Sequence, residues 1–198
     1  MDSLGSFLKS TRREDRICAV LLSLNMIDQD SSGESESGIV NHVFQELGMK
    51  FLLDMISCLV QYHEDSRYLM IGTSAVRFLG VACKYEKLCR LVNQIELTQL
   101  IVLCFEERIQ SDAILSNLIF SIIKFVACSS VESTEFAIHK ILATAAENMK
   151  KRKIVGSLLR TTVDLLQICR ESSVLCNTYG DTILSLIVQG TNNVNYYI

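Results

Sequence analysis

Two long apolar segments of this sequence end in the same three residues, Val-Ala-Cys, at positions 81–83 and 126–128. A third apolar segment ends in Ile168-Cys169, so that the cysteines at the three ends are separated by 45 and 41 residues. Repetition at a fixed period of this size is typical of repeat architectures, in which each unit buries its apolar face against its neighbours. The chain is therefore expected to fold as an array of similar units.

Periodicity and composition indicate that these units are helical. The chain has no proline, the strongest helix breaker, and its apolar residues recur at three- and four-residue steps. The spacing predicts helices near 39–46, 49–62, 67–84, 86–92, 95–108, 112–128, 133–147, 152–170, 172–178 and 181–190. Gly48 and Gly180 each stand between two such segments, where a helix is expected to end and the chain to turn.

A polar, acidic segment at residues 28–38 divides the chain. It contains two glycines and four serines, a composition typical of loops. Before it, apolar residues follow the spacing of one helical face: Ile17, Val20, Leu21, Leu24 and Ile27. We therefore expect an N-terminal helix in residues 1–27 that packs on the array, an acidic flexible loop at 28–38, and the repeat domain at 39–198.

Two segments carry a family resemblance. Phe44-Gln-Glu-Leu-Gly48, followed by an apolar helix, and Ala75-Val-Arg-Phe-Leu-Gly-Val-Ala82 resemble the armadillo repeat, a unit of one short and two longer helices with the HEAT repeat as a relative. Through the same segments the chain is similar to the armadillo domains of the meiotic telomere-bouquet formation proteins. The resemblance implies an all-α, armadillo-like α-α superhelix of about three to four repeats.

The sequence departs from the importin type of armadillo protein, which binds basic peptides through tryptophans and asparagines on its third helices. The matching positions hold Gly80, Phe125 and Gln167 in place of asparagine, and Val76, Ser121 and Val163 in place of tryptophan. Binding of nuclear-localisation peptides in the importin manner is therefore not expected.

Polar residues on the three long helices form the candidate partner-binding site. These are Arg77, Asn117, Ser121, Lys124, Arg160, Thr161 and Asp164. In an armadillo-like array they would lie on the third-helix face, as a mildly basic strip suited to an acidic or helical peptide. The alternative is that they are the solvated faces of amphipathic helices.

Residues suited to catalysis or metal binding are scattered. His42, His63 and His139 lack a zinc-ligand spacing with any cysteine pair, and the cysteines lack the two-residue gap of a redox motif. We expect the cysteines to be buried, reduced thiols within apolar helices. No phosphate-binding glycine loop or nucleophile motif is present in the sequence. No cofactor, no metal and no enzymatic activity are therefore expected.

Charge and hydropathy narrow the choice of partners and compartment. The net charge of −3 does not favour direct nucleic-acid binding, and no uncharged apolar stretch reaches about 18 residues, the length of a membrane span. The first ten residues lack the continuous apolar stretch of a secretory signal. We therefore expect the nucleus or the cytoplasm.

Two further features bear on partners. Lys150, Lys151, Arg152 and Lys153 form a basic run that suits either a nuclear-localisation signal or a solvated helix end. The last predicted helix is strongly apolar through Ile183, Leu186 and Ile187. We expect this surface to dock on a partner or on a second copy of the chain, or to continue into a longer armadillo protein. It needs no partner if residues 196–198 fold back on it.

The sequence thus predicts a non-catalytic scaffold or adaptor that binds another protein, on the third-helix face or at the apolar C-terminal end, in a nuclear assembly. Two alternatives remain open: a regulatory or inhibitory subunit of a larger complex, and a small enzyme whose site residues are dispersed along the sequence and meet in space.

Overall fold

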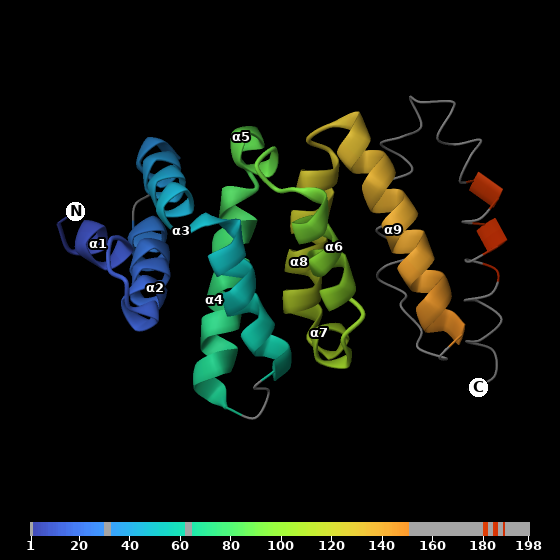
Figure 1. Cartoon of the computed structure of the whole chain (residues 1–198), viewed down its shortest axis with the longest axis horizontal. Coiled ribbons are helices and arrows are strands. Elements are labelled where there is room, and N and C mark those ends of the chain that lie inside the picture. The colour runs from blue at the N-terminus through green and yellow to red at the C-terminus, as the bar shows by residue number, and fades with distance from the viewer. Residues whose placement is uncertain are drawn as a thin grey trace. The chain divides into compact units, whose positions relative to one another are not determined.

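In the part of the chain that the computed structural model describes, all regular secondary structure is helical. This part comprises residues 2–29, 33–61, 65–150, 180–181, 184–185 and 188, and no strand occurs among them. The helices named in Figure 1 are α1 (Asp2–Leu8), α2 (Arg13–Gln29), α3 (Gly33–Gln61), α4 (Ser66–Ala82), α5 (Glu86–Cys89), α6 (Gln94–Leu103), α7 (Glu107–Ser111), α8 (Ala113–Ala127) and α9 (Val131–Lys150). The expectation of an all-α fold is confirmed.

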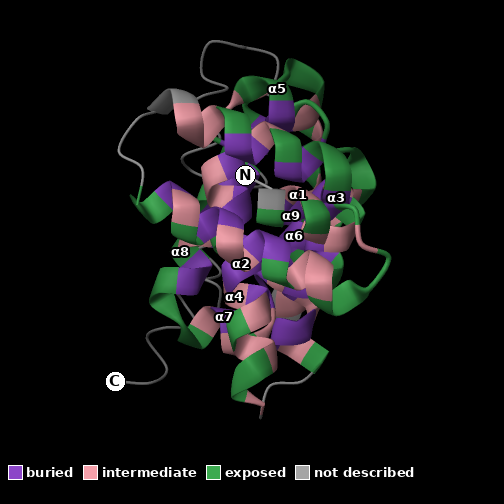
Figure 2. Ribbon diagram, turned by 90° about the vertical axis from the view of Figure 1, so that its left-hand side faces the viewer, coloured by how far each residue is buried: buried purple, intermediate pink, exposed green. Residues whose placement is uncertain are grey.

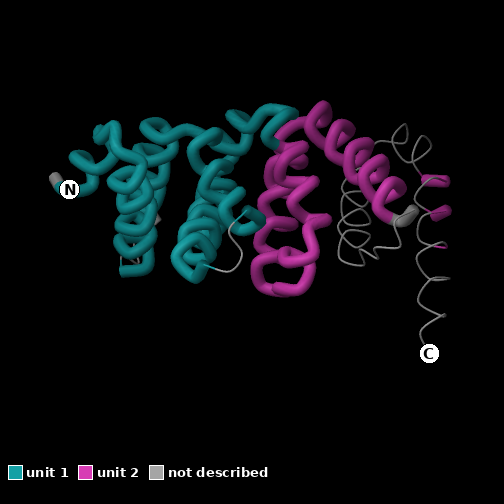
Figure 3. Tube along the Cα trace, turned by 60° about the horizontal axis from the view of Figure 1, so that its bottom comes forward, with its two compact units in different colours: residues 1–96 teal, residues 97–198 magenta. Residues whose placement is uncertain are grey.

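The chain forms two compact units, residues 1–96 and 97–198, which Figure 3 shows in different colours. The division falls inside α6 and not at the expected boundaries after residues 27 and 38. In the first unit α1 packs on α2 and α3, α2 packs on α3 and α4, and α3 packs along α4. In the second unit α8 packs on α7 and α9.

Gly48 breaks α3 into two helical halves. Its backbone angles are φ 74° and ψ 163°, a combination that is strained for any residue with a side chain. The residues on either side, Leu47 and Met49, are both buried. The turn at Gly48 therefore carries the chain from one helix to the next without exposing its apolar flanks, and the predicted helix end at this glycine is confirmed.

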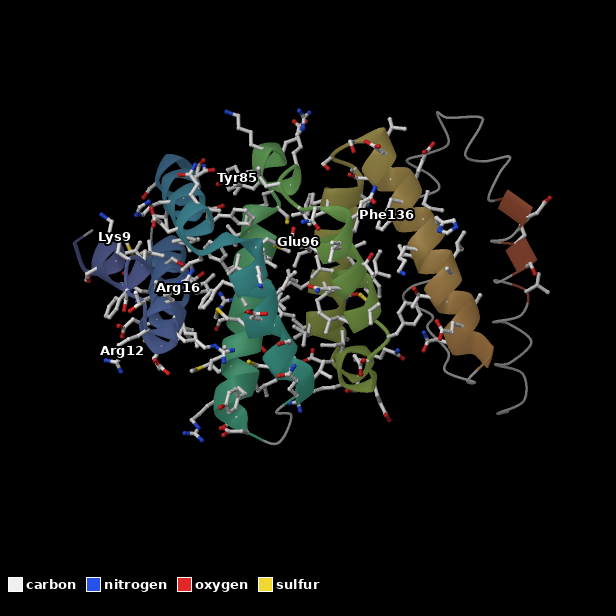
Figure 4. The ribbon with its side chains drawn as sticks, viewed as in Figure 1. Lys9, Arg12, Arg16, Tyr85, Glu96 and Phe136 are labelled. Carbon is white, nitrogen blue, oxygen red and sulfur yellow. The ribbon has the colours of Figure 1, made fainter. Side chains whose placement is uncertain are left out.

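Arg16 of α2 holds the two halves of α3. A break in a helix leaves carbonyl oxygens without their usual partners. The Arg16 guanidinium donates a hydrogen bond to the carbonyl oxygen of Leu47 at 3.3 Å, and its Cζ lies 4.4 Å from the centre of the Phe51 ring. In Figure 4 the labelled Arg16 lies on α2. One side chain thus contacts the end of the first half and the start of the second, partly through a cation–π interaction.

The second half of α3 and α4 form the centre of the first unit. Figure 2 colours the buried residues of the ribbon purple. The largest fully buried side chains on the two helices are Leu52, Met55, Ile56, Leu59, Phe78 and Leu79. Gly72 of α4 lies against them, and a Cβ at this position would meet Leu59 Cγ at 2.5 Å. The two helices approach this closely because Gly72 has no side chain.

The expected acidic loop at 28–38 is wrong for most of its length. α2 continues to Gln29 and α3 begins at Gly33, so the remaining connection, residues 30–32, lies outside the described residues. Glu36 is half-buried. Its carboxylate accepts a hydrogen bond from the Tyr85 hydroxyl at 3.1 Å and lies 3.7 Å from the Lys84 ammonium. Burial and this bond raise the pKa of Tyr85. The acidic residues therefore have partners in the folded unit that the local sequence does not reveal.

Two further elements differ from expectation. The helix predicted at 95–108 is two helices, since the chain turns at Cys104–Glu106 through bonds to carbonyls three residues back and so buries Cys104 and Phe105. The N-terminal helix expected in residues 1–27 is also two helices, α1 and α2, and α1 buries Leu4 and Leu8, one turn apart. In both places contacts with other helices decide the local structure.

Helices α4 and α8 begin and end in the same way. Asp65 and Asp112 are their N-caps: the Asp65 carboxylate accepts one hydrogen bond from a backbone N–H of the first turn, and the Asp112 carboxylate accepts two. Cys83 and Cys128 are their C-caps, with φ and ψ of −72° and −5° in one and −73° and −6° in the other. The repeated Val-Ala-Cys of the sequence therefore marks the same structural position in both helices.

Replacing Gly48 tests the backbone constraint in α3. Gly48→Ala is expected to lower the free energy of unfolding by about 1–3 kcal/mol, because alanine is strained at positive φ. The matched control is Gly38→Ala in the same helix, where φ is helical and a Cβ meets nothing within 4 Å. That change is expected to raise stability by about 0.4–1 kcal/mol. Urea unfolding followed by circular dichroism measures both, and equal effects would contradict the assigned role of Gly48.

Replacing Gly72 tests the close packing of α3 and α4. Gly72→Ala is expected to lower the free energy of unfolding by about 1–3 kcal/mol through overpacking, although alanine is the better helix former. The new methyl group would also lie 3.2 Å from the backbone oxygen of Met55, which cannot move without shifting α3. Unchanged or increased stability in the same urea measurement would show that the two helices can separate without cost.

Candidate functional site

Helices α4 and α8 each carry a narrow stripe of exposed or half-buried side chains with the same spacing. On α4 the stripe contains Met70, Thr73 and Arg77, and on α8 it contains Ile114, Asn117, Ser121, Phe125 and Cys128, which we call the α8 stripe. Steps of three and four residues place its members on one side of the helix. Every member of the α8 stripe is exposed. The opposite face of α8 is buried through Leu115, Ile119, Ile122, Ile123 and Val126.

The predicted site residues lie on two different helices, and several lie outside the described residues. Asn117 and Ser121 belong to the α8 stripe, and Lys124 is exposed beside Phe125 on the same helix. Arg77 occupies the corresponding stripe of α4 in the other compact unit. Arg160, Thr161 and Asp164, together with Lys151, Arg152 and Lys153, lie outside the described residues. Lys150 is the last residue of α9, and its side chain also lies outside them.

Arg77 is paired, which changes the predicted basic strip. Its guanidinium lies 3.2 Å from a carboxylate oxygen of Asp28 on α2, and both side chains are about half exposed. An exposed pair of this kind is worth about 0–1 kcal/mol, so it adds little to stability. It does place a negative charge next to Arg77. The surface around Arg77 is therefore less basic than the sequence suggested.

Sequence reasoning missed the apolar members of the α8 stripe. Ile114 is 83% exposed and Phe125 is 44% exposed, on a side of the helix where polar residues were expected. Neither residue is among the predicted site residues, because apolar residues are usually buried. A projection of α8 at 100° per residue puts all four residues on one face, because Asn117, Ser121 and Phe125 follow Ile114 by three, seven and eleven residues. The stripe therefore has an apolar residue near each end and polar residues between.

The polar centre of the α8 stripe retains hydrogen-bonding capacity. Ser121 donates its hydroxyl proton to the carbonyl oxygen of Asn117 at 2.9 Å, which leaves the hydroxyl oxygen to accept. Within the described residues the Asn117 carboxamide has no hydrogen-bond partner, so it can both donate and accept. Two apolar contacts around such a centre suit recognition of another chain.

Among the described residues, no group of three or more histidine, cysteine, aspartate or glutamate side chains is arranged to hold a metal ion. No helix in this part of the chain is both long and apolar enough to span a membrane. His63 lies outside the described residues, while His42 and His139 are on α3 and α9.

Comparison of the chain with protein-family models, with curated proteins and with solved structures gives no match in any of the three. What the α8 stripe does must therefore be inferred from its own geometry and chemistry.

Thiol labelling tests the exposure of the α8 stripe. In the folded chain a brief maleimide pulse is expected to label Cys128 and Cys18, which are exposed, much faster than Cys104, which is fully buried. Burial also raises the pKa of the Cys104 thiol, so that little of the reactive thiolate forms. Peptide mass spectrometry gives the rate at each cysteine, with the urea-unfolded chain as the reference for equal access. Equal rates at Cys104 and Cys128 before unfolding would contradict the assigned surface.

Proposed function

We propose that this protein is a non-catalytic interaction module that binds a segment of another protein on the α8 stripe. The observation that carries the proposal is the exposure of Ile114 and Phe125 on either side of a polar centre with free hydrogen-bonding capacity at Asn117. A purely solvated face would carry charged or polar side chains at these positions. An exposed apolar surface that borders on polar residues is typical of interaction surfaces.

The fitting partner is an amphipathic helix or an extended peptide of similar length. From Ile114 to Phe125 the stripe rises about 16 Å, the length of about three helical turns. Apolar anchors in the partner would meet Ile114 and Phe125, and a polar group would meet Asn117.

We further propose that the helices are armadillo-like repeats of an α-α superhelix. Three features support this assignment: the glycine break that divides α3 into two helices before α4, the short α5 that precedes α6, and the matching caps of α4 and α8. In such an array the stripes of α4 and α8 are third-helix positions. The basic run at 150–153 supports a nuclear assembly as the setting, with the cytoplasm as the alternative compartment.

Paired surface variants test the proposal. Ile114→Asp places a charge in the α8 stripe, and it is expected to weaken partner binding about tenfold or more, which corresponds to about 1.4 kcal/mol or more. Val131→Asp is the matched control, because Val131 is 69% exposed at the start of α9 and lies outside the stripe. Affinity capture with the tagged full chain, quantified by mass spectrometry, compares the two variants with the unmodified protein.

The proposal requires a partner that the unmodified chain and Val131→Asp retain and that Ile114→Asp loses. A partner retained equally by both variants would place the contact elsewhere, and capture of no partner would contradict the proposed function. The captured partner is then tested directly on the purified chain. It should slow maleimide labelling of Cys128, which lies in the stripe, and leave Cys18 on α2 unchanged.

A further inference from the structure

The turn between α4 and α5 brings two cysteines together. Cys83 is the C-cap of α4, and Cys89 is the last residue of α5. The Cys89 thiol donates a hydrogen bond to the carbonyl oxygen of Cys83, with Sγ and O 3.1 Å apart. Both residues are buried, at 3% and 2% exposure. The Cys89 side chain therefore lies against the backbone of Cys83.

The surrounding backbone fixes this arrangement. Cys83 N–H donates to the Leu79 carbonyl oxygen at 2.8 Å, which ties it to the last turn of α4. Cys89 N–H donates to the Tyr85 carbonyl oxygen at 3.3 Å, and its own carbonyl oxygen accepts from Val92 N–H at 3.1 Å. Because the backbone of both residues is held in this way, Cys89 stays against Cys83 as long as the turn is intact.

The two thiols differ in their readiness to react. The interaction between the two cysteine side chains raises the pKa of Cys83 and lowers that of Cys89. A thiolate is the nucleophilic form of cysteine, so Cys89 is the member of the pair that reacts first. Cys83 lies next to it as the resolving thiol, an arrangement typical of redox-sensitive cysteines.

We propose that Cys83 and Cys89 are a redox modification site that a hydroperoxide converts into an intramolecular disulfide. Cys89 thiolate attacks one peroxide oxygen and breaks the O–O bond, which gives a sulfenic acid on Cys89 and, with one proton, a hydroxyl compound or water. The Cys83 sulfur then attacks the sulfenyl sulfur, the S–O bond breaks, and the second oxygen leaves as water with the thiol proton. The two sulfurs are oxidised by two electrons in total, and the peroxide is reduced by two.

Helix α5 controls both the access of an oxidant to the two sulfurs and the effect of the disulfide. This helix has only four residues, and exposed Lys84, Lys87 and Arg90 lie along the segment, so a small oxidant reaches the buried sulfurs when the segment opens locally. A disulfide between its last residue and the C-cap of α4 closes the segment covalently. Oxidation is therefore expected to suppress the opening of residues 84–92.

Peptide mapping of the full chain tests the site. The chain is treated with hydrogen peroxide, remaining thiols are blocked with N-ethylmaleimide, and trypsin is applied without reduction. Lys84 and Lys87 lie between the two cysteines, so cleavage leaves Cys83 and Cys89 in one species only when a disulfide links them. The expected result is this linked species, about 2 Da lighter than its two peptides, separated again by dithiothreitol. Oxidised chain should also show slower amide hydrogen exchange at 84–92.

Two variants keep the outcome decisive. In Cys83→Ser the linked species should be absent, and Cys89 should accumulate as a sulfenic acid that dimedone traps. In Cys128→Ser, which removes an exposed cysteine outside the pair, the linked species should form as in the unmodified chain. If Cys18 and Cys128 are oxidised while Cys83 and Cys89 remain two separate maleimide-labelled peptides, the proposed site is wrong and the pair serves only packing.

Discussion

The backbone at Gly48 is the constraint on which the first unit depends. Positive φ at this residue ends one helix and starts the next without an intervening loop. Leu47 and Met49 can then both be buried, and the freed carbonyl of Leu47 becomes the acceptor for Arg16 of α2. The second half of α3 in turn packs against α4 at Gly72, where no side chain fits. Two glycines with different tasks, one conformational and one steric, thus set the positions of α2, α3 and α4.

Helices α4 and α8 have the same caps but carry different residues in their stripes. Aspartate N-caps and cysteine C-caps fix both helices in nearly identical backbone geometry. On α4 the charge of Arg77 is met by Asp28, a residue supplied by α2. On α8 the stripe instead presents Ile114 and Phe125 around Asn117 and Ser121. The shared caps therefore explain the sequence repeat, and the differing stripe residues explain why the interaction surface is proposed on α8.

Local signals made much of the fold predictable, and tertiary contacts account for the rest. Gly48 and the ends of α4 and α8 follow from glycine conformation and from capping, which act within a few residues. Composition predicts a loop for the helical residues 33–38, because the contacts of Glu36 with Tyr85 and Lys84 span almost fifty residues. In the candidate site, periodicity found Asn117 and Ser121. It missed the exposure of Ile114 because hydrophobicity alone assigns isoleucine to a core.

The cysteine of the Val-Ala-Cys repeat is buried in one helix and exposed in the other, and the segment that follows it causes the difference. After Cys83 the chain turns into the short α5, whose Cys89 covers Cys83 and hydrogen-bonds to it. After Cys128 the chain passes through two serines into α9, and Cys128 remains exposed. Equivalent cysteines in equivalent caps thus become one half of a buried dithiol in one unit and an exposed thiol in the other. Repetition in the sequence specifies the helix and its end, whereas the reactivity of the cysteine depends on the connection that is built after it.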